Sequence, residues 1–163
     1  MYLEKYNLKG RNAVVTGGGQ AIGLACVEAL AEAGAHVVIA DYNAQVAETG
    51  RDAMKAKGYA CDIAIVDVTD SKGVEALAEK LEKTGGTQIL VNNAGIARSA
   101  IPGENMEDER WLNVLDVNLN GTFFACQAFA RRLLDQGRGG SALLISSMSA
   151  QVVNVPQHQA SYH

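Results

Sequence analysis

Short apolar runs recur along the chain and alternate with longer amphipathic segments. The runs are rich in Val, Ile, Leu and Ala, and each is followed by a Gly, Asp, Asn or Ser; they cover residues 13–16, 36–40, 62–66, 88–91 and 141–145. A strand that is buried on both faces has this nearly continuous apolar character. We therefore predict five strands.

The segments between these runs carry the spacing of apolar residues that is typical of helices. The predicted helices are Leu24–Ala33, Ala44–Gly58, Lys72–Lys83 and Trp111–Gln136. Gly58 suits a helix C-cap, and Asp70 or Asp67 suits the N-cap of the third helix, with Asp70 the natural start. Strands that alternate with helices predict a doubly wound α/β (Rossmann) fold with right-handed crossovers, and we expect the strand order 3-2-1-4-5.

The longest helical pattern contains one unexpected polar residue. Asn118 lies between Val117 and Leu119, and asparagine is a poor helix former. Such a side chain either bonds locally or reaches into a site. Trp111, at the start of the pattern, is interpreted as a packing residue.

Composition narrows the class of protein. The 163 residues suggest one domain, and the formal net charge of −4 argues against nucleic acid or an anionic membrane as the partner. Residues 1–10 lack the apolar core of a signal peptide, and no run is long enough to span a membrane. The three cysteines are scattered without metal-binding spacing, which indicates a reducing compartment, and we expect a cytoplasmic protein without a metal.

The first strand runs into a glycine cluster, Thr16-Gly17-Gly18-Gly19-Gln20-Ala21-Ile22-Gly23. Strand, glycine turn and helix in this order are typical of a dinucleotide-binding unit. Gly17 permits a sharp turn, Gly18 and Gly19 leave room for a pyrophosphate, and the helix N-terminus attracts the anion. Gly23 lets the helix pack closely on the sheet. A purely structural turn is the alternative.

The next strand ends at Asp41, 18 residues after Gly23. A carboxylate there accepts hydrogen bonds from ribose hydroxyls and repels a 2′-phosphate, so the favoured cofactor is NAD and not NADP. The alternative is that Asp41 caps the following helix.

Polar residues also follow the third and fourth strands. Asp67 and Val68 are predicted to form a wall for the adenine ring, although Asp67 could instead cap a helix. Asn92-Asn93-Ala94-Gly95 follows the fourth strand, at the edge where ligands bind in open parallel sheets. An ordinary turn is the alternative for this segment.

These residues together resemble the short-chain dehydrogenase/reductase family over essentially the whole chain. The resemblance rests on the glycine turn, Asp67-Val68, Asn92-Asn93-Ala94-Gly95, Asn118 with Gly121, Ser147 and Tyr162. The runs Ser146-Ser147-Met148-Ser149 and Val153-Asn154-Val155-Pro156-Gln157 look most like the members that act on polyols and sugar alcohols. The resemblance implies the cofactor-binding residues Gly17, Gly19, Gln20, Ala21, Ile22, Gly23, Asp41, Asp67, Val68, Asn93, Ala94 and Gly95.

The resemblance also implies a mechanism, which is hydride transfer between NAD and a carbon that bears a hydroxyl. Tyr162 would act as the general base, Ser147 would hydrogen-bond the substrate oxygen, and Asn118 would hold a water in the proton relay. Further hydroxyls of a polyol would be bound by Ser149, Gln151 and Asn154. His158 is interpreted as a surface residue.

The catalytic serine has two candidates. Ser149 lies 13 residues before Tyr162, which is the commoner family spacing, whereas Ser147 lies 15 residues before it. We favour Ser147 because Ile145-Ser146-Ser147 aligns with the strand end and residues 154–159 look like a two-residue insertion.

The chain departs from the family pattern at two places. Ala21 replaces a glycine, and we expect its methyl group to be tolerated. The family's lysine, four residues after the tyrosine, would fall beyond His163. We therefore expect residues 1–163 to be a single NAD-binding domain from the N-terminal portion of a longer protein. Alone, this chain should be poorly stable and inactive, because its fifth strand would be an exposed edge.

The sequence thus favours an NAD-dependent oxidoreductase that acts on a secondary alcohol or its ketone, with a polyol or sugar as the expected substrate. Family resemblance implies a homodimer or homotetramer, built partly through the helix that contains Asn118. A non-catalytic nucleotide-binding module and a nucleotide-sugar epimerase or dehydratase are the alternatives. The Asn92–Gly95 motif and Ser147 argue against the epimerase or dehydratase.

Overall fold

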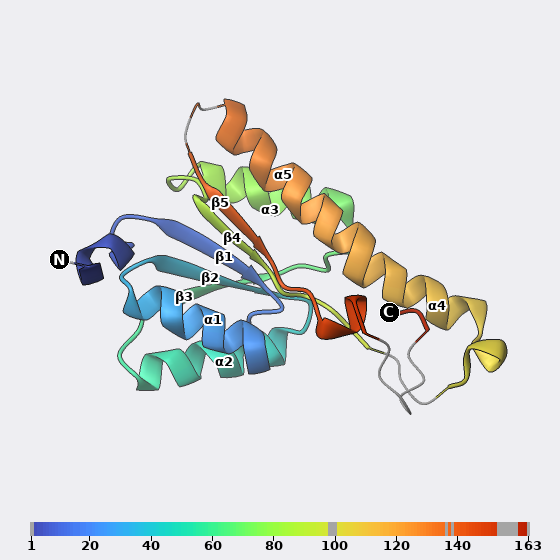
Figure 1. Ribbon diagram of the computed structural model, residues 1–163. Helices are drawn as coiled ribbons and strands as arrows, with labels where there is room; N and C mark the ends of the chain where they lie inside the picture. The colour runs from blue at the N-terminus through green and yellow to red at the C-terminus, as the bar shows by residue number, and fades with distance from the viewer. Residues whose placement is uncertain (1, 98–100, 136, 138, 153–159, 163) are drawn as a thin grey trace.

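The computed structural model describes residues 2–97, 101–135, 137, 139–152 and 160–162. Its centre is a five-stranded sheet with the order β3-β2-β1-β4-β5, in which every neighbouring pair is parallel. The strands are β1 Asn12–Thr16, β2 His36–Asp41, β3 Cys61–Ile65, β4 Ile89–Asn92 and β5 Ser141–Leu144. The predicted fold class and strand order are confirmed (Figure 1).

Helices cover both faces of the sheet. The helices α1 (Ala21–Glu32) and α2 (Ala44–Ala56) lie on one face, whereas α3 (Ser71–Glu82) and α5 (Gly121–Asp135) lie on the other (Figure 1). Shorter elements are η1 Tyr2–Tyr6, η2 Gly103–Asn105, α4 Asp108–Leu115, η3 Asp116–Asn120 and η4 Met148–Ala150. Because all five strands are parallel, their carboxyl ends lie at the same edge of the sheet, and helices cover the sheet on both faces.

The alternation of side chains along β1 explains the two hydrophobic clusters. Ala13 and Val15 pack in the cluster that includes Val27 of α1, while Val14 packs in the cluster that includes Phe129 of α5. Because successive side chains of a strand point to opposite faces, a strand between two helical layers must be apolar at every position. This is why the runs in the sequence are continuous.

Asparagine and aspartate side chains set the starts of two helices. Asn43 caps α2, since its side chain accepts a hydrogen bond from the Val46 N–H at 3.2 Å. The alternative role of Asp41 as this cap is therefore wrong. Asp70 caps α3 by accepting from the Lys72 N–H, as predicted, and Asp67 instead accepts from the backbone and hydroxyl of Thr69.

The segment predicted as one helix from Trp111 is divided. α4 ends at Leu115, the π-helical turn η3 follows at Asp116–Asn120, and α5 begins at Gly121. Gly121 lies so close to Val68 that an added Cβ would be 2.7 Å from Val68 Cγ2. The wider turn contains Asn118, which makes hydrogen bonds outside the helix, and this tertiary contact is not visible in the helical periodicity.

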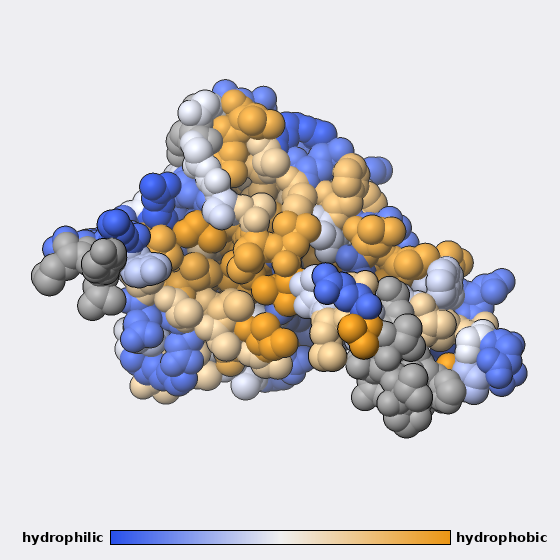
Figure 2. Space-filling view, viewed as in Figure 1, coloured by the Kyte–Doolittle hydropathy of each residue, from blue (hydrophilic) through white to orange (hydrophobic). Residues whose placement is uncertain are grey.

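The edge strand β5 is exposed, as predicted. Leu143, Leu144 and Ile145 are 54%, 52% and 39% exposed. Figure 2 shows hydrophobic residues gathered on the part of the surface where β5 and α5 lie. Apolar surface of this extent is typical of a face that another segment or subunit covers.

All three cysteines are free, and burial, with a further contribution from Asp62, raises the pKa of the Cys61 thiol. None of the helices in the described residues has the length and apolar character needed to span a membrane. Within the same residues, no group of three or more His, Cys, Asp and Glu side chains is arranged to hold a metal ion.

Candidate functional site

The glycine turn lies between β1 and α1 at the carboxyl edge of the sheet. Gly17 has φ +61°, a backbone conformation that favours glycine, and its N–H donates to the Ala40 carbonyl at 2.7 Å. Residue 20 is extended, and α1 begins at Ala21, not at Leu24 as predicted. The turn therefore presents the first backbone N–H groups of α1 at the edge of the sheet.

Contacts within the protein explain why the following positions are glycine. An added Cβ at Gly18 would lie 2.8 Å from the Val15 carbonyl oxygen, and one at Gly19 would lie 2.8 Å from the Val46 carbonyl oxygen. An added Cβ at Gly50 of α2 would lie 2.6 Å from the carbonyl oxygen of Gly19. Packing of the turn against β1, α1 and α2 thus requires these glycines, in addition to any need for an anion to approach.

Gly23 is the most constrained glycine in the turn. An added Cβ there would collide with the carbonyl oxygen of Gly17 and lie 2.6 Å from Asn93 Nδ2. Gly23 is also buried in the first turn of α1. The close approach of α1 to the sheet, which the sequence predicted, is therefore a close approach to the glycine turn and to the end of β4.

Ala21 has φ +48° and is the one non-glycine residue with a positive φ among the described residues. The methyl group is exposed, so the expected steric tolerance is reasonable. The cost lies in the backbone, because a left-handed conformation places Cβ close to the following carbonyl oxygen and costs about 1–2 kcal/mol.

We expect Ala21→Gly to raise the free energy of unfolding by about 0.5–1 kcal/mol, since relief of the left-handed strain exceeds the entropic cost of glycine. Ala25→Gly is the matched control, because Ala25 is also exposed in α1 but has no positive φ. It should lower stability by about 1 kcal/mol. Urea unfolding measures the free energy of unfolding of both variants. A loss of stability in both would show that the backbone at Ala21 is not strained.

Asp41 lies at the end of β2 with its side chain directed at the glycine turn. The residue is 6% exposed; Oδ2 accepts from the Gly19 N–H at 3.3 Å, and Oδ1 accepts from the Asn43 N–H at 3.1 Å. A carboxylate is therefore held beside the turn by two backbone donors. The sequence predicted a carboxylate at the end of the second strand, but not its hydrogen bond to the glycine turn.

The ends of β1 and β4 are joined by Thr16 and Asn93. The Thr16 hydroxyl accepts from the Asn93 and Ala94 N–H groups at 3.1 Å, and Asn93 Nδ2 donates to the carbonyls of Thr16 and Gly17. Asn92, which is 5% exposed, instead donates to Thr122 and Cys126 of α5. Sequence reasoning missed the part played by Thr16, although a polar residue at the end of an apolar run was the available signal.

Asn118 holds the chain that follows β4. Its Oδ1 accepts from the Ile96 N–H at 2.8 Å, and its Nδ2 donates to the Ile96 carbonyl at 2.9 Å. An added Cβ at Gly95 would lie 3.4 Å from Asn118 Oδ1. Both atoms of the side-chain amide are thus engaged with the segment after Asn92-Asn93-Ala94-Gly95, which the structure brings next to η3.

The remaining predicted site residues follow β5. Ser147 is half-buried, and its Oγ accepts from the Ser149 N–H at 3.2 Å; Ser149 is 5% exposed, and Gln151 is exposed. Asn154 lies outside the described residues. Tyr162 is half-buried, and among the described residues no hydrogen bond joins it to Ser147 or Asn118.

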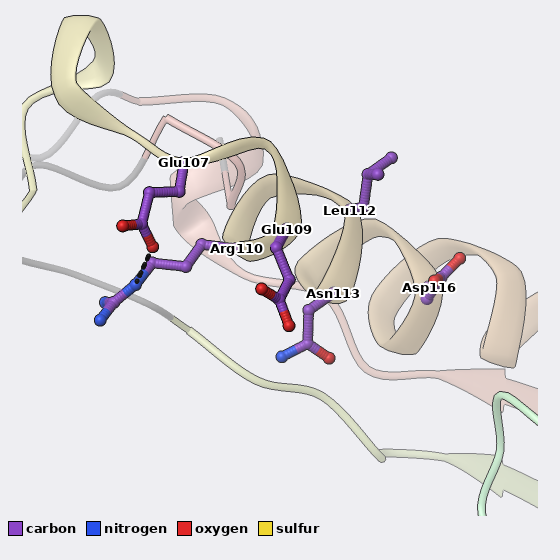
Figure 3. Close-up of a pocket in the computed structure, with 6 residues that line it drawn as sticks. All are labelled: Glu107, Glu109, Arg110, Leu112, Asn113 and Asp116. Carbon is purple, nitrogen blue, oxygen red and sulfur yellow. Dashed lines mark ion pairs between the residues drawn. The ribbon is translucent and has the colours of Figure 1, made fainter.

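A separate cavity lies along α4, away from the glycine turn. It is lined by Glu107, Glu109, Arg110, Leu112, Asn113 and Asp116 (Figure 3). Arg110 and Glu107 form an ion pair at 3.6 Å, so part of the acidic charge is already balanced. None of the predicted site residues lines this cavity.

The parallel sheet, the glycine turn and the polar strand ends define a Rossmann-like α/β protein with its site at the carboxyl edge of the sheet. Comparison with known families is consistent with this class. The family model described as "short chain dehydrogenase" matches residues 11–162. The chain therefore belongs to the short-chain dehydrogenase family, whose members bind a nicotinamide cofactor.

Individual relatives show how much of a family member the chain represents. It is 45% identical to galactitol 2-dehydrogenase of Rhizobium johnstonii over 99% of this chain and 63% of that protein. It is 38% identical to D-threitol dehydrogenase of Mycolicibacterium smegmatis over 95% of this chain and 59% of that protein. The chain thus spans less than two thirds of the length of these relatives.

A solved structure agrees with the fold. The gluconate 5-dehydrogenase from Burkholderia cenocepacia J2315, in complex with NADP and tartrate, superposes with a TM-score of 0.88 and 37% identity. The match covers 99% of this chain and 62% of that one. That protein holds NADP, so membership of the family does not by itself select NAD.

Proposed function

We propose that this chain provides the cofactor-binding and catalytic residues of an NAD-dependent oxidoreductase. The enzyme would transfer a hydride between NAD and a secondary alcohol or its ketone. The observation that carries the proposal is the buried Asp41 carboxylate, held at the end of β2 beside the glycine turn. Residues 1–163 would act as one nucleotide-binding domain.

The residues at the carboxyl edge fit an adenine dinucleotide. The positive end of α1 and the first N–H groups of that helix, at Ala21, Ile22 and Gly23, would face a pyrophosphate. Gly17, Gly19 and Gln20 would line the turn beside it, where the N–H groups of Gly17 and Gly19 are already bonded to Ala40 and Asp41. Asp41 would accept from the ribose hydroxyls, Asp67 and Val68 would lie beside the adenine, and Asn93, Ala94 and Gly95 would line the inner half of the site. When bound, the nicotinamide supplies the hydride acceptor or donor.

Asp41 should decide between NAD and NADP. Asp41→Asn keeps an oxygen that can accept from one backbone N–H but removes the charge that holds the ribose and repels a 2′-phosphate. We expect the ratio of the dissociation constants for NADP and NAD to fall by about 100-fold in this variant. Asp62→Asn, at an exposed position of β3, is the control. Calorimetric titration with both nucleotides measures the ratio. If Asp41→Asn prefers NAD over NADP as strongly as the wild-type protein does, Asp41 does not set the cofactor preference.

Three residues would carry the chemistry. Tyr162 would take the hydroxyl proton as general base, and Ser147 would donate a hydrogen bond to the substrate oxygen and to the developing alkoxide. Asn118 would hold a water in the proton relay. The side-chain amide of Asn118 is already bonded to the backbone of Ile96, so the water would have to bind the backbone of Asn118. Asn118 lies in the π-helical turn η3, where the regular α-helical hydrogen-bond pattern is interrupted.

A polyol is the proposed substrate. The support is the similarity to relatives named for galactitol and D-threitol, together with polar side chains after β5 that could bind further hydroxyls, namely Ser149, Gln151 and Asn154. The intact protein should be screened against sugar alcohols with NAD and with NADP, with the absorbance of the reduced cofactor as the signal. Turnover of polyols with NAD supports the proposal, and turnover only of substrates without neighbouring hydroxyls contradicts it.

The protein is also proposed to form a homodimer or homotetramer in the cytoplasm. Leu119 at the end of η3 and Phe123 on α5 are 62% and 56% exposed, which leaves apolar surface available for a second copy. Three unpaired cysteines fit a reducing compartment.

A further inference from the structure

Thr122 lies in the first turn of α5, directly after the π-helical turn η3 and Gly121. Its hydroxyl donates a hydrogen bond to the Asn118 carbonyl at 2.8 Å. Threonine hydroxyls often bond the carbonyl four residues earlier in a helix, and Thr49 of α2 does the same to the Gln45 carbonyl at 2.8 Å. The bond alone is therefore ordinary, and what distinguishes Thr122 is its position.

The backbone of Thr122 is tied to the carboxyl edge of the sheet. Its carbonyl accepts at 3.1 Å from Nδ2 of Asn92, a residue at the end of β4 that is 5% exposed. Asn92 Oδ1 in turn accepts from the Thr16 hydroxyl at the end of β1 at 3.4 Å. The preceding residue, Gly121, packs against Val68. Thr122 is thus connected through Asn92 to the ends of two neighbouring strands.

Asn118 is held from another direction by the chain that follows β4. Its side-chain Oδ1 and Nδ2 are both engaged with the backbone of Ile96. The Thr122 hydroxyl engages the main-chain carbonyl of the same residue. Because a carbonyl oxygen has two lone pairs, this bond leaves one lone pair of the Asn118 carbonyl for a second donor.

The hydrogen bond of Thr122 spans a change in the helical register. In η3 the Gly121 N–H donates to the Asp116 carbonyl, five residues earlier, whereas α5 continues as a regular α-helix. A side-chain bond across this change stabilises the place where the π-helical turn ends. Thr49, in contrast, lies inside the regular helix α2, where its bond spans no such change.

We propose that Thr122 is a positioning residue for the proposed hydride-transfer reaction. Its hydroxyl holds η3 in the register in which the Asn118 amide bonds Ile96, and it fixes the direction of the carbonyl whose second lone pair would accept the relay water. This inference rests on the proposed function, since it assumes that Tyr162 passes its proton to a water at Asn118. Thr122 itself would touch neither cofactor nor substrate.

The test combines steady-state kinetics of the intact protein with amide hydrogen exchange. Thr122→Val keeps the shape of the side chain and removes the hydroxyl. With NAD and the polyol that the wild-type protein oxidises fastest, it should lower kcat about fivefold and leave KM and the dissociation constant for NAD unchanged. Exchange of the Ile96 N–H should become about fivefold faster, because its acceptor, Asn118 Oδ1, is less firmly held.

Two further variants complete the comparison. Thr122→Ser keeps the hydroxyl and should recover most of kcat. Thr49→Val is the matched control, because it removes the same kind of bond at the same distance from a regular helix, and it should leave kcat and Ile96 exchange unchanged. If urea unfolding shows that Thr122→Val does not fold, Thr122→Ala removes the hydroxyl with a smaller side chain and is measured in its place.

The outcomes separate this inference from the proposed function. Wild-type protein that oxidises no polyol with NAD overturns the proposed function and this inference with it. Active wild-type protein whose kcat or Ile96 exchange is unchanged by loss of the Thr122 hydroxyl overturns this inference alone. A loss of kcat that Thr122→Ser does not restore, or that Thr49→Val shows equally, also overturns it, because neither result depends on a hydroxyl at the end of η3.

Discussion

Replacing Ser147 by alanine should lower kcat by about 100- to 1000-fold, because a donor aimed at a developing oxyanion contributes that much to acyl and related transfers. Ser147 lies just beyond β5 at the carboxyl edge and is half-buried, and its Oγ accepts from the Ser149 N–H at 3.2 Å. That hydrogen bond fixes the oxygen and leaves the hydroxyl proton available for donation. Steady-state kinetics of the intact protein with a polyol and NAD measure the loss.

Ser149→Ala and Ser146→Ala are the matched variants. Ser149 is 5% exposed, so its loss should mainly raise KM or reduce stability, while Ser146 is exposed and its loss should have little effect. The dissociation constant for NAD should be unchanged in Ser147→Ala. A small effect of Ser147→Ala combined with a collapse of kcat in Ser149→Ala would reverse the assignment.

Replacing Gly23 by alanine should lower the free energy of unfolding by about 3 kcal/mol, at the upper end for an inserted methyl group. The new Cβ would meet the Gly17 carbonyl oxygen and Asn93 Nδ2. Neither neighbour can move freely, because Asn93 Nδ2 donates to the carbonyls of Thr16 and Gly17 and the Gly17 N–H donates to Ala40. Relief of the clash must therefore displace α1 or separate the ends of β1 and β4.

Gly139→Ala is the control for this variant, since an added Cβ at Gly139 meets nothing within 4 Å and its φ is not positive. Urea unfolding should show a large loss for Gly23→Ala and almost none for Gly139→Ala. The same displacement should weaken NAD binding in Gly23→Ala under conditions where the protein is still folded. Equal stability of the two variants would show that the turn is looser than described.

Much of the fold could be predicted from the sequence because it follows from local patterns. Strands buried between two helical layers must be apolar throughout, and this requirement marked the central strands β1, β2 and β4. Asp70 at the start of α3 and the positive φ of Gly58 after α2 are likewise set by residues a few positions away. These features depend on hydrogen bonds and backbone angles within single elements.

Features that depend on distant residues could not be predicted in this way. The π-helical turn at Asp116–Asn120 accompanies hydrogen bonds between Asn118 and Ile96, which are 22 residues apart. The glycines at positions 18 and 19 are required by Val15 and Val46. Asn43, not Asp41, caps α2, so the carboxylate is left to bond the glycine turn, and that contact spans 22 residues.

The central claim is that the glycine turn and Asp41 together hold NAD, and it is tested most directly by calorimetric titration of the intact protein with NAD and NADP. We expect saturable binding of NAD that is tighter than binding of NADP, with the difference lost in Asp41→Asn. The absence of a heat of association with either nucleotide, or a preference for NADP in the wild-type protein, would contradict the claim.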